Sequence, residues 1–247
     1  MIPKTIHYCW FGDKKLPSLA KKCIHSWKKY LPDYEIKMWN ESNFDVNIIP
    51  YTKEAYESKR YAFVSDYARY WILYHYGGVY FDTDVEVLKP MNEILERGAY
   101  MGFESSIESE ALYVNAGLGM AVEAGNPFLK EMLAIYSRLH FINPDGSYNL
   151  KSIVKYTSEV LVTKGLVRTN KIQKTCDIYI YPKEYFNPYN YRTKKFELTN
   201  KTYTIHYFAG SWITRKERFM KWIEIHLGKW YVDIIHRTYT RIIKKRS

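Results

Sequence analysis

The stretch that decides the fold is Tyr76-Gly77-Gly78-Val79-Tyr80-Phe81-Asp82-Thr83-Asp84. Its β-branched and aromatic centre predicts a buried strand over residues 79–81, and the two glycines give the sharp turn that lets a helix feed that strand. Two carboxylates follow where the strand ends, at the edge where open α/β sheets bind ligands. Asp82 and Asp84 are therefore candidate ligands of a hard divalent cation, which prefers carboxylate oxygen. The alternative is a polar turn with two solvated acids.

Alternating strand and helix patterns surround this stretch. They predict a mainly parallel α/β sheet flanked by helices. The longest helical pattern, over residues 53–76, has an apolar stripe and leads into the strand. The predicted strands are 5–10, 35–39, 79–81, 99–103, 178–181 and 203–208, and the predicted helices are 18–30, 53–76, 127–140 and 152–163.

Composition narrows the class of protein. The chain has 247 residues, with 25 Tyr, 7 Trp and 11 Phe, side chains that fill cores and also stack on nucleobases and sugars. Three widely spaced cysteines predict neither a disulfide framework nor a zinc site. No apolar run of membrane length and no signal-peptide pattern are present, so we expect a cytoplasmic protein.

Positive charge is concentrated at the C-terminus. Residues 213–247 contain ten Lys or Arg and three Asp or Glu, a net charge of +7 out of +11 for the whole chain. We expect a catalytic domain over residues 1–212 and a basic, amphipathic, helical tail over 213–247. Two alternatives remain open for the tail: it packs on the domain, or residues 231–247 touch an anionic membrane at the inner face of the plasma membrane. A nucleic-acid partner is not expected, because the body is nearly neutral.

The helix before the acidic pair carries further polar candidates. Ser65, Asp66 and Arg69 fall roughly on one face, beside the apolar stripe. Because this helix runs directly into the strand, its carboxylate and guanidinium are candidates for binding sugar hydroxyls or phosphate oxygens. A surface ion pair three residues apart is the alternative. The small-residue segment at Asn115 and Gly117 is either a loop that binds the acceptor or a sugar, or a tight turn.

Three motifs together resemble one known family. Residues 2–12 (IPKTIHYCWFG), 65–69 (SDYAR) and 77–84 (GGVYFDTD) look like the sugar transferases with a DXD sugar-binding region, glycosyltransferase family 32. This family includes bacterial capsule and lipopolysaccharide enzymes and yeast mannosyltransferases, with the glucosylating clostridial toxins as more distant relatives. The resemblance is dense over residues 1–90 and continues thinly to residues 206–212.

The resemblance implies a GT-A fold, a nucleotide-sugar donor, Mn²⁺ or Mg²⁺, and retention at the anomeric carbon. By motif, Trp10 would stack on the nucleobase, Tyr80 would line the nucleotide pocket, and Asp84 would be a direct metal ligand. Asp82 would contact the donor and the metal. Asp66 and Arg69 would hold the donor sugar, His206 or Ser211 would complete the metal shell, and Trp212 would approach the diphosphate. Ser65 and Asn115 are further candidates for binding the donor.

These expectations favour a metal-dependent, retaining glycosyltransferase. It would move a hexose or N-acetylhexosamine, from a UDP-sugar by the pattern at Trp10, to a glycan or lipid-linked oligosaccharide of a capsule, lipopolysaccharide or other surface polysaccharide. Arg69 would stabilise charge as the bond to the anomeric carbon breaks. The alternative is a metal-dependent phosphoryl hydrolase that uses Asp82 and Asp84. A two-metal hydrolase needs further acids that converge on the pair, and the sequence offers no second cluster of that kind.

Overall fold

Parallel strands form the part of the sheet that carries the acidic pair. In the computed structural model, which describes residues 1–105, 111–190 and 193–210, β1 (Thr5–Cys9) lies between β2 (Glu35–Trp39) and β3 (Gly78–Tyr80). Both neighbours run parallel to β1. Their carboxyl ends therefore meet at one edge of the sheet, as the sequence predicted.

The remaining strands make the sheet mixed. Its order is β2-β1-β3-β7-β5-β9-β8, with β6 paired to β5. β5 and β9 are parallel, whereas β7 and β6 run antiparallel to their neighbours and β8 runs antiparallel to β9. The bounds are β5 Tyr100–Ser105, β6 Leu112–Asn115, β7 Met120–Val122, β8 Gln173–Thr175 and β9 Ile178–Tyr181.

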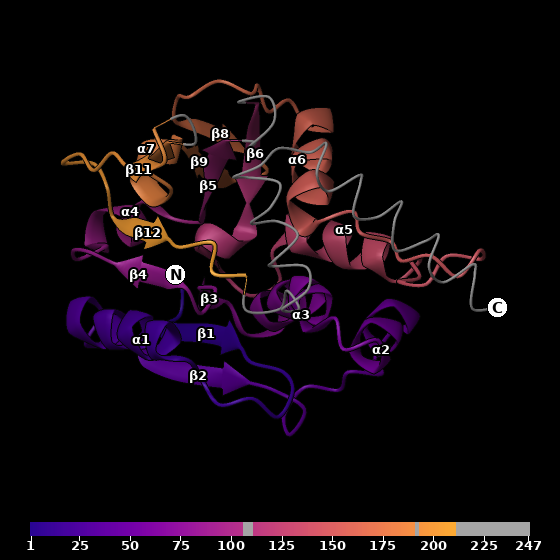
Figure 1. The fold of residues 1–247 in the computed structure, drawn as a ribbon. Coiled ribbons are helices and arrows are strands. Elements are labelled where there is room, and N and C mark those ends of the chain that lie inside the picture. The colour runs from indigo at the N-terminus through magenta and orange to yellow at the C-terminus, as the bar shows by residue number, and fades with distance from the viewer. Residues whose placement is uncertain (106–110, 191–192, 211–247) are drawn as a thin grey trace. The chain divides into compact units, whose positions relative to one another are not determined.

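Two short ladders lie outside this sheet. β4 (Val85–Val87) pairs antiparallel with β12 (Thr204–His206), and β10 (Tyr189–Asn190) pairs antiparallel with β11 (Lys195–Phe196). The first ladder matters for the site, because it joins the segment after the acidic pair to a strand more than 100 residues later in the chain. In Figure 1, β4 and β12 lie next to each other beside the central sheet.

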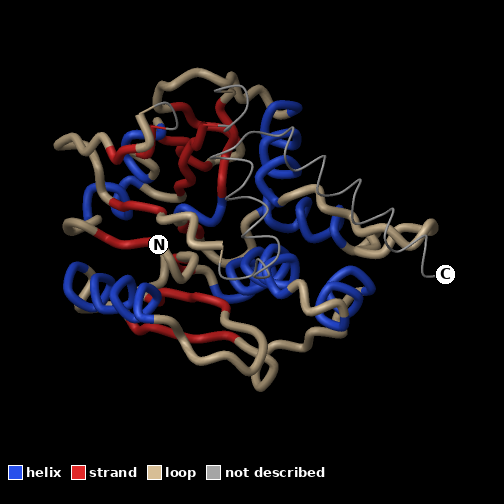
Figure 2. The backbone as a smooth tube through the Cα atoms, viewed as in Figure 1, coloured by secondary structure: helices blue, strands red, loops and turns tan. Residues whose placement is uncertain are grey.

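Helices cover both faces of the sheet, as Figures 1 and 2 show, and the predicted α/β class is confirmed. Side chains of β3 alternate between two apolar clusters: Val79 belongs to the cluster that contains Trp27 of α1, and Tyr80 belongs to the cluster that contains Phe63 and other residues of α3. A strand buried on both faces needs a continuous apolar run, which is what the sequence provides. The helices are α1 Ser18–Tyr30, α2 Pro50–Glu57, α3 Tyr61–Tyr76, α4 Asn92–Arg97, α5 Pro127–Tyr136, α6 Ile153–Thr163 and α7 Lys183–Phe186, with a 3₁₀ turn η1 at Ala116–Leu118.

The prediction of one helix over residues 53–76 is wrong. The chain forms α2 and α3, separated at Ser58–Arg60. Lys59 has a φ of 55°, its N–H bonds to the carbonyl of Tyr56 at 2.8 Å, and the N–H of Arg60 bonds to the carbonyl of Ala55 at 2.8 Å. This pair of bonds is a Schellman ending. A Schellman ending usually has glycine at the left-handed position. Because Lys59 occupies that position here, nothing in the sequence indicated that a helix ends there.

The turn from α3 into β3 follows the prediction. Gly77 and Gly78 have φ values of 63° and 100°, in the region that favours glycine. A Cβ on Gly77 would also lie 2.7 Å from the backbone nitrogen of Ala124. Gly77 donates its N–H to the carbonyl of Leu73 at 2.9 Å, which ends the helix. The chain can therefore reverse from helix to strand within two residues.

A buried histidine ties this turn to the first strands. His7 is 2% exposed, and its Nδ1 accepts the indole N–H of Trp39 at 3.0 Å. Nε2 must then carry the proton and donate to the carbonyl of Gly77, also at 3.0 Å. Both ring nitrogens are used by the neutral imidazole, and burial lowers the pKa of His7 to about 4.

We expect His7 to make the fold sensitive to mild acid. Between its unfolded pKa of about 6.5 and its folded pKa of about 4, the unfolded chain binds the extra proton, so stability falls as the pH drops. The loss from pH 7 to pH 5 should be about 2 kcal/mol for this group. Urea unfolding of wild type and His7→Gln at both pH values measures it. Equal pH dependence in the two proteins would contradict this role.

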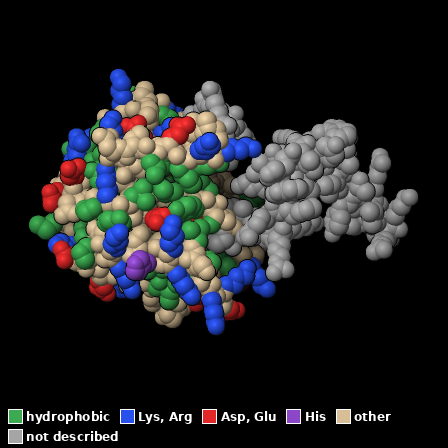
Figure 3. Space-filling model, turned by 60° about the vertical axis from the view of Figure 1, so that its left-hand side comes forward, with side chains coloured by type: hydrophobic (Ala, Val, Ile, Leu, Met, Phe, Trp, Pro, Cys, Tyr) green, Lys and Arg blue, Asp and Glu red, His purple; other side chains and the backbone are tan. Residues whose placement is uncertain are grey.

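Residues Met1–Phe208 form one compact unit. Residues 211–247 lie outside the described residues, so the expected domain boundary at 212 and the helical tail stay predictions. Within the part that is described, no helix has both the length and the apolar character needed to span a membrane. Figure 3 shows lysine and arginine side chains spread over the visible face with acidic ones among them, in keeping with the small net charge of the body.

Candidate active site

Trp10 and the acidic pair leave the sheet at the same edge. The N–H of Phe81 bonds to the carbonyl of His7 at 3.1 Å, so the β1–β3 ladder continues one residue beyond β3. Asp82 follows directly. Trp10 follows the end of β1, is partly exposed, and donates its indole N–H to the carbonyl of Lys14 at 2.5 Å. The arrangement that the sequence predicted for this edge is present, while the contact of Trp10 with a base stays a prediction.

The turn after β3 brings Asp84 to His206. Val85 donates its N–H to the carbonyl of Asp82 at 3.0 Å and pairs with His206 across the β4–β12 ladder. His206 Nε2 lies 3.1 Å from Asp84 Oδ1. Ligand atoms of Asp82, Asp84 and His206 all lie within 4.8 Å of one another. We call these three residues the Asp-Asp-His cluster.

The donor set of this cluster fits a divalent cation. Burial lowers the pKa of His206, but the carboxylates of Asp84, Asp82 and Glu104 outweigh this effect, and the net shift is upward. The cluster thus attracts positive charge. Nδ1 of His206 is buried and finds no hydrogen-bond partner among the described residues. Two carboxylates and an imidazole suit Mn²⁺ better than Mg²⁺, which prefers oxygen ligands throughout.

Arg69 lies between two carboxylates rather than in open space. It is 4% exposed, and its Nη2 lies 3.1 Å from Asp66 Oδ1 and 3.2 Å from Asp82 Oδ1. Its Nε donates to the carbonyl of Ser65 at 3.2 Å. These contacts occupy most of the guanidinium donors. Arg69 therefore orients the carboxylate of Asp82. A direct contact of Arg69 with substrate stays a prediction.

Asp66 joins α3 to α6. Its Oδ2 accepts the backbone N–H of Ile153, the first residue of α6, at 3.4 Å, where the positive end of a helix favours a carboxylate. Burial raises the pKa of Asp66 to about 6, although Arg69 opposes the shift. Only 8% of Asp66 is exposed. Its predicted contact with a donor sugar is not tested by this geometry.

Tyr80 and Ser65 support the same group of residues. The ring of Tyr80 lies under Arg69, 4.9 Å from the guanidinium carbon, and its hydroxyl donates to Asp82 Oδ1 at 3.1 Å. Ser65 donates its hydroxyl to the carbonyl of Tyr61 at 3.1 Å. Both side chains thus hold the site together, and their predicted contacts with the donor stay predictions. The other two predicted residues, Ser211 and Trp212, lie outside the described residues.

Glu104 was not among the site residues predicted from the sequence. This residue of β5 accepts a hydrogen bond at Oε2 from Nδ2 of Asn115 at 2.8 Å, and Oδ1 of Asn115 accepts the N–H of Gly117 at 2.6 Å. The carbonyl of Gly117 in turn accepts the N–H of Asp82 at 3.3 Å. Asn115 is therefore both a turn former and a neighbour of the site. A lone acid directly after the predicted strand 99–103 was the available signal.

Gly117 is a position where one methyl group should disturb the site. A Cβ there would lie 2.1 Å from Asp82 Oδ2 and 3.0 Å from Arg69 Nη1. Asp82 would have to move, because its Cβ-to-carboxylate reach is short. We expect Gly117→Ala to lower transfer or donor hydrolysis about tenfold, as small misplacements at a reacting centre do. Activity and thermal unfolding of the variant measure this, and unchanged activity would show that the position of Asp82 does not matter.

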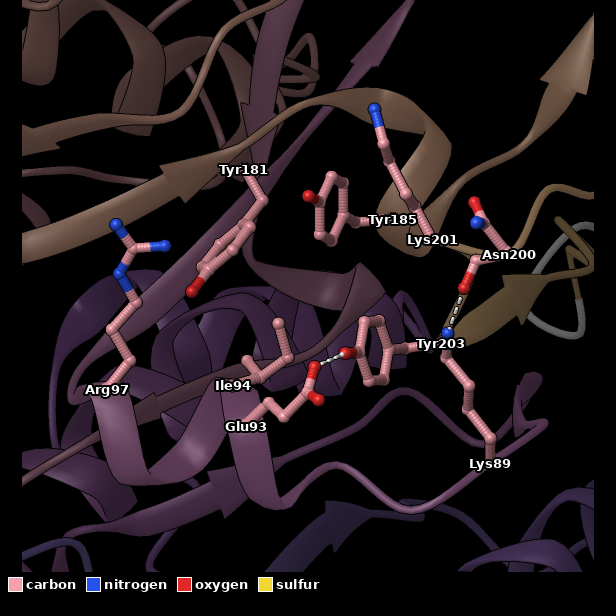
Figure 4. A pocket seen from close by; sticks show the side chains of 9 residues that line it. All are labelled: Lys89, Glu93, Ile94, Arg97, Tyr181, Tyr185, Asn200, Lys201 and Tyr203. Atoms are coloured by element: carbon pink, nitrogen blue, oxygen red, sulfur yellow. Dashed lines mark hydrogen bonds between the residues drawn. The ribbon is translucent and has the colours of Figure 1, made fainter.

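A separate cavity of about 350 Å³ lies at the end of the β4–β12 ladder that is farther from His206 (Figure 4). Two of its polar side chains already have hydrogen-bond partners within the lining. Tyr203 donates its hydroxyl to Glu93 at 2.7 Å, and Lys89 donates to the carbonyl of Asn200. Because Tyr203 precedes β12 and His206 ends it, this cavity is not part of the Asp-Asp-His cluster.

Comparison with known families identifies part of the chain. Residues 17–100 match the model of the glycosyltransferase sugar-binding region containing a DXD motif. Both Arg69 and the Asp82–Asp84 pair lie within the match. Residues 17–100 are therefore similar to that glycosyltransferase family. The predicted resemblance is confirmed for the motifs at 65–69 and 77–84, whereas residues 2–12 precede the matched sugar-binding region.

Curated relatives carry transferase names. Inositol phosphoceramide mannosyltransferase 1 of Schizosaccharomyces pombe is 32% identical over 111 residues, which are 40% of this chain and 33% of that protein. An uncharacterized glycosyltransferase of Acanthamoeba polyphaga mimivirus is 26% identical over 220 residues, which are 86% of this chain and 84% of that protein. The chain therefore spans about a third of the length of the yeast relative.

Solved structures of glycosyltransferases resemble the fold at low identity. The PaToxG glycosyltransferase has a TM-score of 0.49 and 20% identity, covering 66% of this chain and 70% of its own. A glycosyltransferase involved in glycosylation of the major capsid of PBCV-1 has a TM-score of 0.48 and 14% identity, covering 87% of this chain and 96% of its own.

Proposed function

We propose that this chain is a metal-dependent, retaining glycosyltransferase. It moves a hexose or N-acetylhexosamine from a nucleotide sugar to a glycan acceptor in the synthesis of a capsule, lipopolysaccharide or other surface polysaccharide. The observation that carries this proposal is the Asp-Asp-His cluster, whose two aspartates follow β3 within the segment that matches the family's sugar-binding region. Trp10 at the same edge supports a nucleotide beside the cluster.

Asp82, Asp84 and His206 would hold the cation. When bound there, a divalent ion neutralises the diphosphate leaving group and acts as a Lewis acid on its oxygens. Residues of the chain hold the proposed metal ligands in position. Arg69 and Tyr80 fix the carboxylate of Asp82 through contacts of 3.2 Å and 3.1 Å, and Gly117 holds its backbone. A site fixed in advance in this way stabilises developing charge without reorganising.

The proposed stereochemistry is retention by reaction on one face. The bond from the anomeric carbon to the diphosphate oxygen breaks, the acceptor oxygen bonds on the same face, and its proton passes to the departing diphosphate. Retention rests on the resemblance to the family rather than on a distance in the site. Proton NMR of the first product formed would test it, since an inverted anomeric signal would exclude this route.

UDP-sugars are the proposed donors, by the pattern at Trp10. The relatives named as mannosyltransferases make GDP-mannose the competing donor. The experiment is a thermal-shift panel of UDP-glucose, UDP-galactose, their N-acetyl forms and GDP-mannose, each with and without Mn²⁺. A ligand at one hundred times its Kd stabilises the fold by about 2.7 kcal/mol. We expect one donor to stand out, and only with Mn²⁺; no response to any donor would overturn the proposal.

No observation favours the phosphoryl hydrolase. Among the residues that the structure describes, one cluster of three potential metal ligands is found, whereas a two-metal hydrolase needs ligands for two ions roughly 3.5–4 Å apart. Product assays separate the two functions. Release of UDP from a UDP-sugar supports transfer, and release of phosphate from simple phosphate esters supports the hydrolase.

The acceptor is proposed to be a glycan or lipid-linked oligosaccharide at the inner face of the plasma membrane. The basic residues of 231–247 are the proposed membrane contact, and they lie outside the described residues. Anionic surfaces attract such segments by about 1 kcal/mol per basic residue. Flotation with anionic vesicles, before and after deletion of 231–247, tests this proposal. Undiminished flotation of the deleted protein would end it.

A further inference from the structure

Glu104 is a charged side chain in a strand whose other residues are all buried. β5 reads Tyr-Met-Gly-Phe-Glu-Ser, and of these residues only Glu104 is partly exposed. The strand lies inside the sheet, paired with β6, β7 and β9. A carboxylate in such a place is costly unless it has partners or a ligand.

One oxygen of the Glu104 carboxylate already accepts a hydrogen bond. Oε2 accepts the hydrogen bond from Asn115 at 2.8 Å, and Asn115 is itself held by the N–H of Gly117. Oε1 receives no hydrogen bond from any residue that the structure describes. The side chain is thus held in one orientation with one oxygen left to accept a further bond.

Glu104 stands beside the Asp-Asp-His cluster without belonging to it. Its ligand atoms are not among those that lie within 4.8 Å of one another. It is still close enough for the charges of His206 and Asp82 to act on it, while burial raises its pKa. A cation held by the cluster would therefore leave Glu104 as a neighbouring carboxylate free to contact what the cation binds.

We propose that Glu104 binds the sugar of the donor, with Oε1 accepting a hydrogen bond from a hydroxyl group of the transferred sugar while Oε2 stays on Asn115. The inference rests on the proposed function, because it places the diphosphate at the Asp-Asp-His cluster. The sugar is bonded to that diphosphate and so lies next to the cluster. A site that hydrogen-bonds a hydroxyl strongly rejects analogues that lack it, which makes Glu104 a determinant of donor specificity.

Glu104→Gln is the decisive variant. Its amide oxygen still accepts from Asn115, but the free position becomes an N–H₂ donor. Calorimetric titration with Mn²⁺ compares UDP alone with the four UDP-sugars of the panel, or GDP with GDP-mannose if the panel selects guanine. We expect the Kd of UDP to stay within about twofold and that of the chosen donor to rise roughly ten- to hundredfold, as for a bond to a charged group. Glu131→Gln, at a partly exposed acid on α5 that pairs with Lys164 away from the site, is the matched control.

Each outcome has a distinct meaning. Unchanged donor affinity in Glu104→Gln, with UDP binding intact, would overturn the role of Glu104 and leave the proposed function standing. Failure of the wild type to bind any nucleotide with Mn²⁺ would instead defeat the proposed function. If the glutamine variant does not fold, Glu104→Ala replaces it, with UDP binding as the check on the site.

Deoxy donors separate direct contact from an effect passed through Asn115. Removing the hydroxyl that Glu104 binds should weaken the wild type about as much as Glu104→Gln does, and should weaken the variant no further. If every deoxy donor loses the same factor in both proteins, Glu104 does not touch the sugar. That result would contradict the inference even where the variant binds donor poorly.

Discussion

Asp84→Asn should abolish metal-dependent activity. The amide loses the negative charge that a divalent cation needs, and the ligand atom next to His206 becomes a weaker donor. We expect kcat/KM for transfer or donor hydrolysis to fall at least about a thousandfold, which corresponds to roughly 4 kcal/mol of transition-state stabilisation. The donor that stabilises the wild type in Mn²⁺ should no longer do so.

The fold of this variant should survive. The introduced amide carries no charge, so the repulsion between the two acids is relieved, and the thermal midpoint without metal should stay within a few degrees of the wild type. Asp177→Asn, at a carboxylate that is 92% exposed, is the matched control and should keep full activity. A variant at position 84 that binds donor with the metal response of the wild type would refute the assignment of Asp84.

Arg69→Leu should cost more stability than any other single change in the site. It removes the positive charge between Asp66 and Asp82 and leaves two carboxylates in a largely buried place. Breaking a buried ion pair in this way costs about 3–5 kcal/mol. Urea unfolding at pH 8 measures the loss. At pH 5 the loss should be smaller, because Asp66, whose pKa is already raised to about 6, is then protonated.

A double-mutant cycle isolates the interaction. Asp66→Asn removes one of the charges that Arg69→Leu strands, so the double variant should be less destabilised than the sum of the two single variants. Arg69→Lys keeps the charge but not the forked geometry, and should fall between wild type and leucine. Strict additivity of the two changes, with no effect of pH, would mean that Arg69 does not balance these carboxylates.

Local patterns made one edge of the site predictable. Gly77-Gly78, the apolar run and Asp82 follow one another in the chain, so their arrangement depends on turn geometry and strand pairing alone. Trp10 joins them because parallel strands end at a common edge. The resemblance to the family added His206, which lies 122 residues from Asp84 and comes next to it only through the β4–β12 ladder.

Tertiary packing determined what the sequence did not reveal. The exposure of Arg69 depends on how closely α3 lies against the turn at Asp82, and periodicity gives the face of a helix but not this distance. Lys59 ends α2 in a left-handed conformation without glycine. The position of Glu104 beside Asn115 depends on the antiparallel pairing of β5 with β6.

Whether the Asp-Asp-His cluster carries a cation that holds a nucleoside diphosphate is tested most directly by a crystal structure of the protein with Mn²⁺ and UDP. We expect the anomalous signal of manganese between Asp82, Asp84 and His206, with diphosphate oxygens on the ion and the uracil near Trp10. Manganese and nucleotide bound together elsewhere, with these three side chains free of metal, would contradict the proposed function.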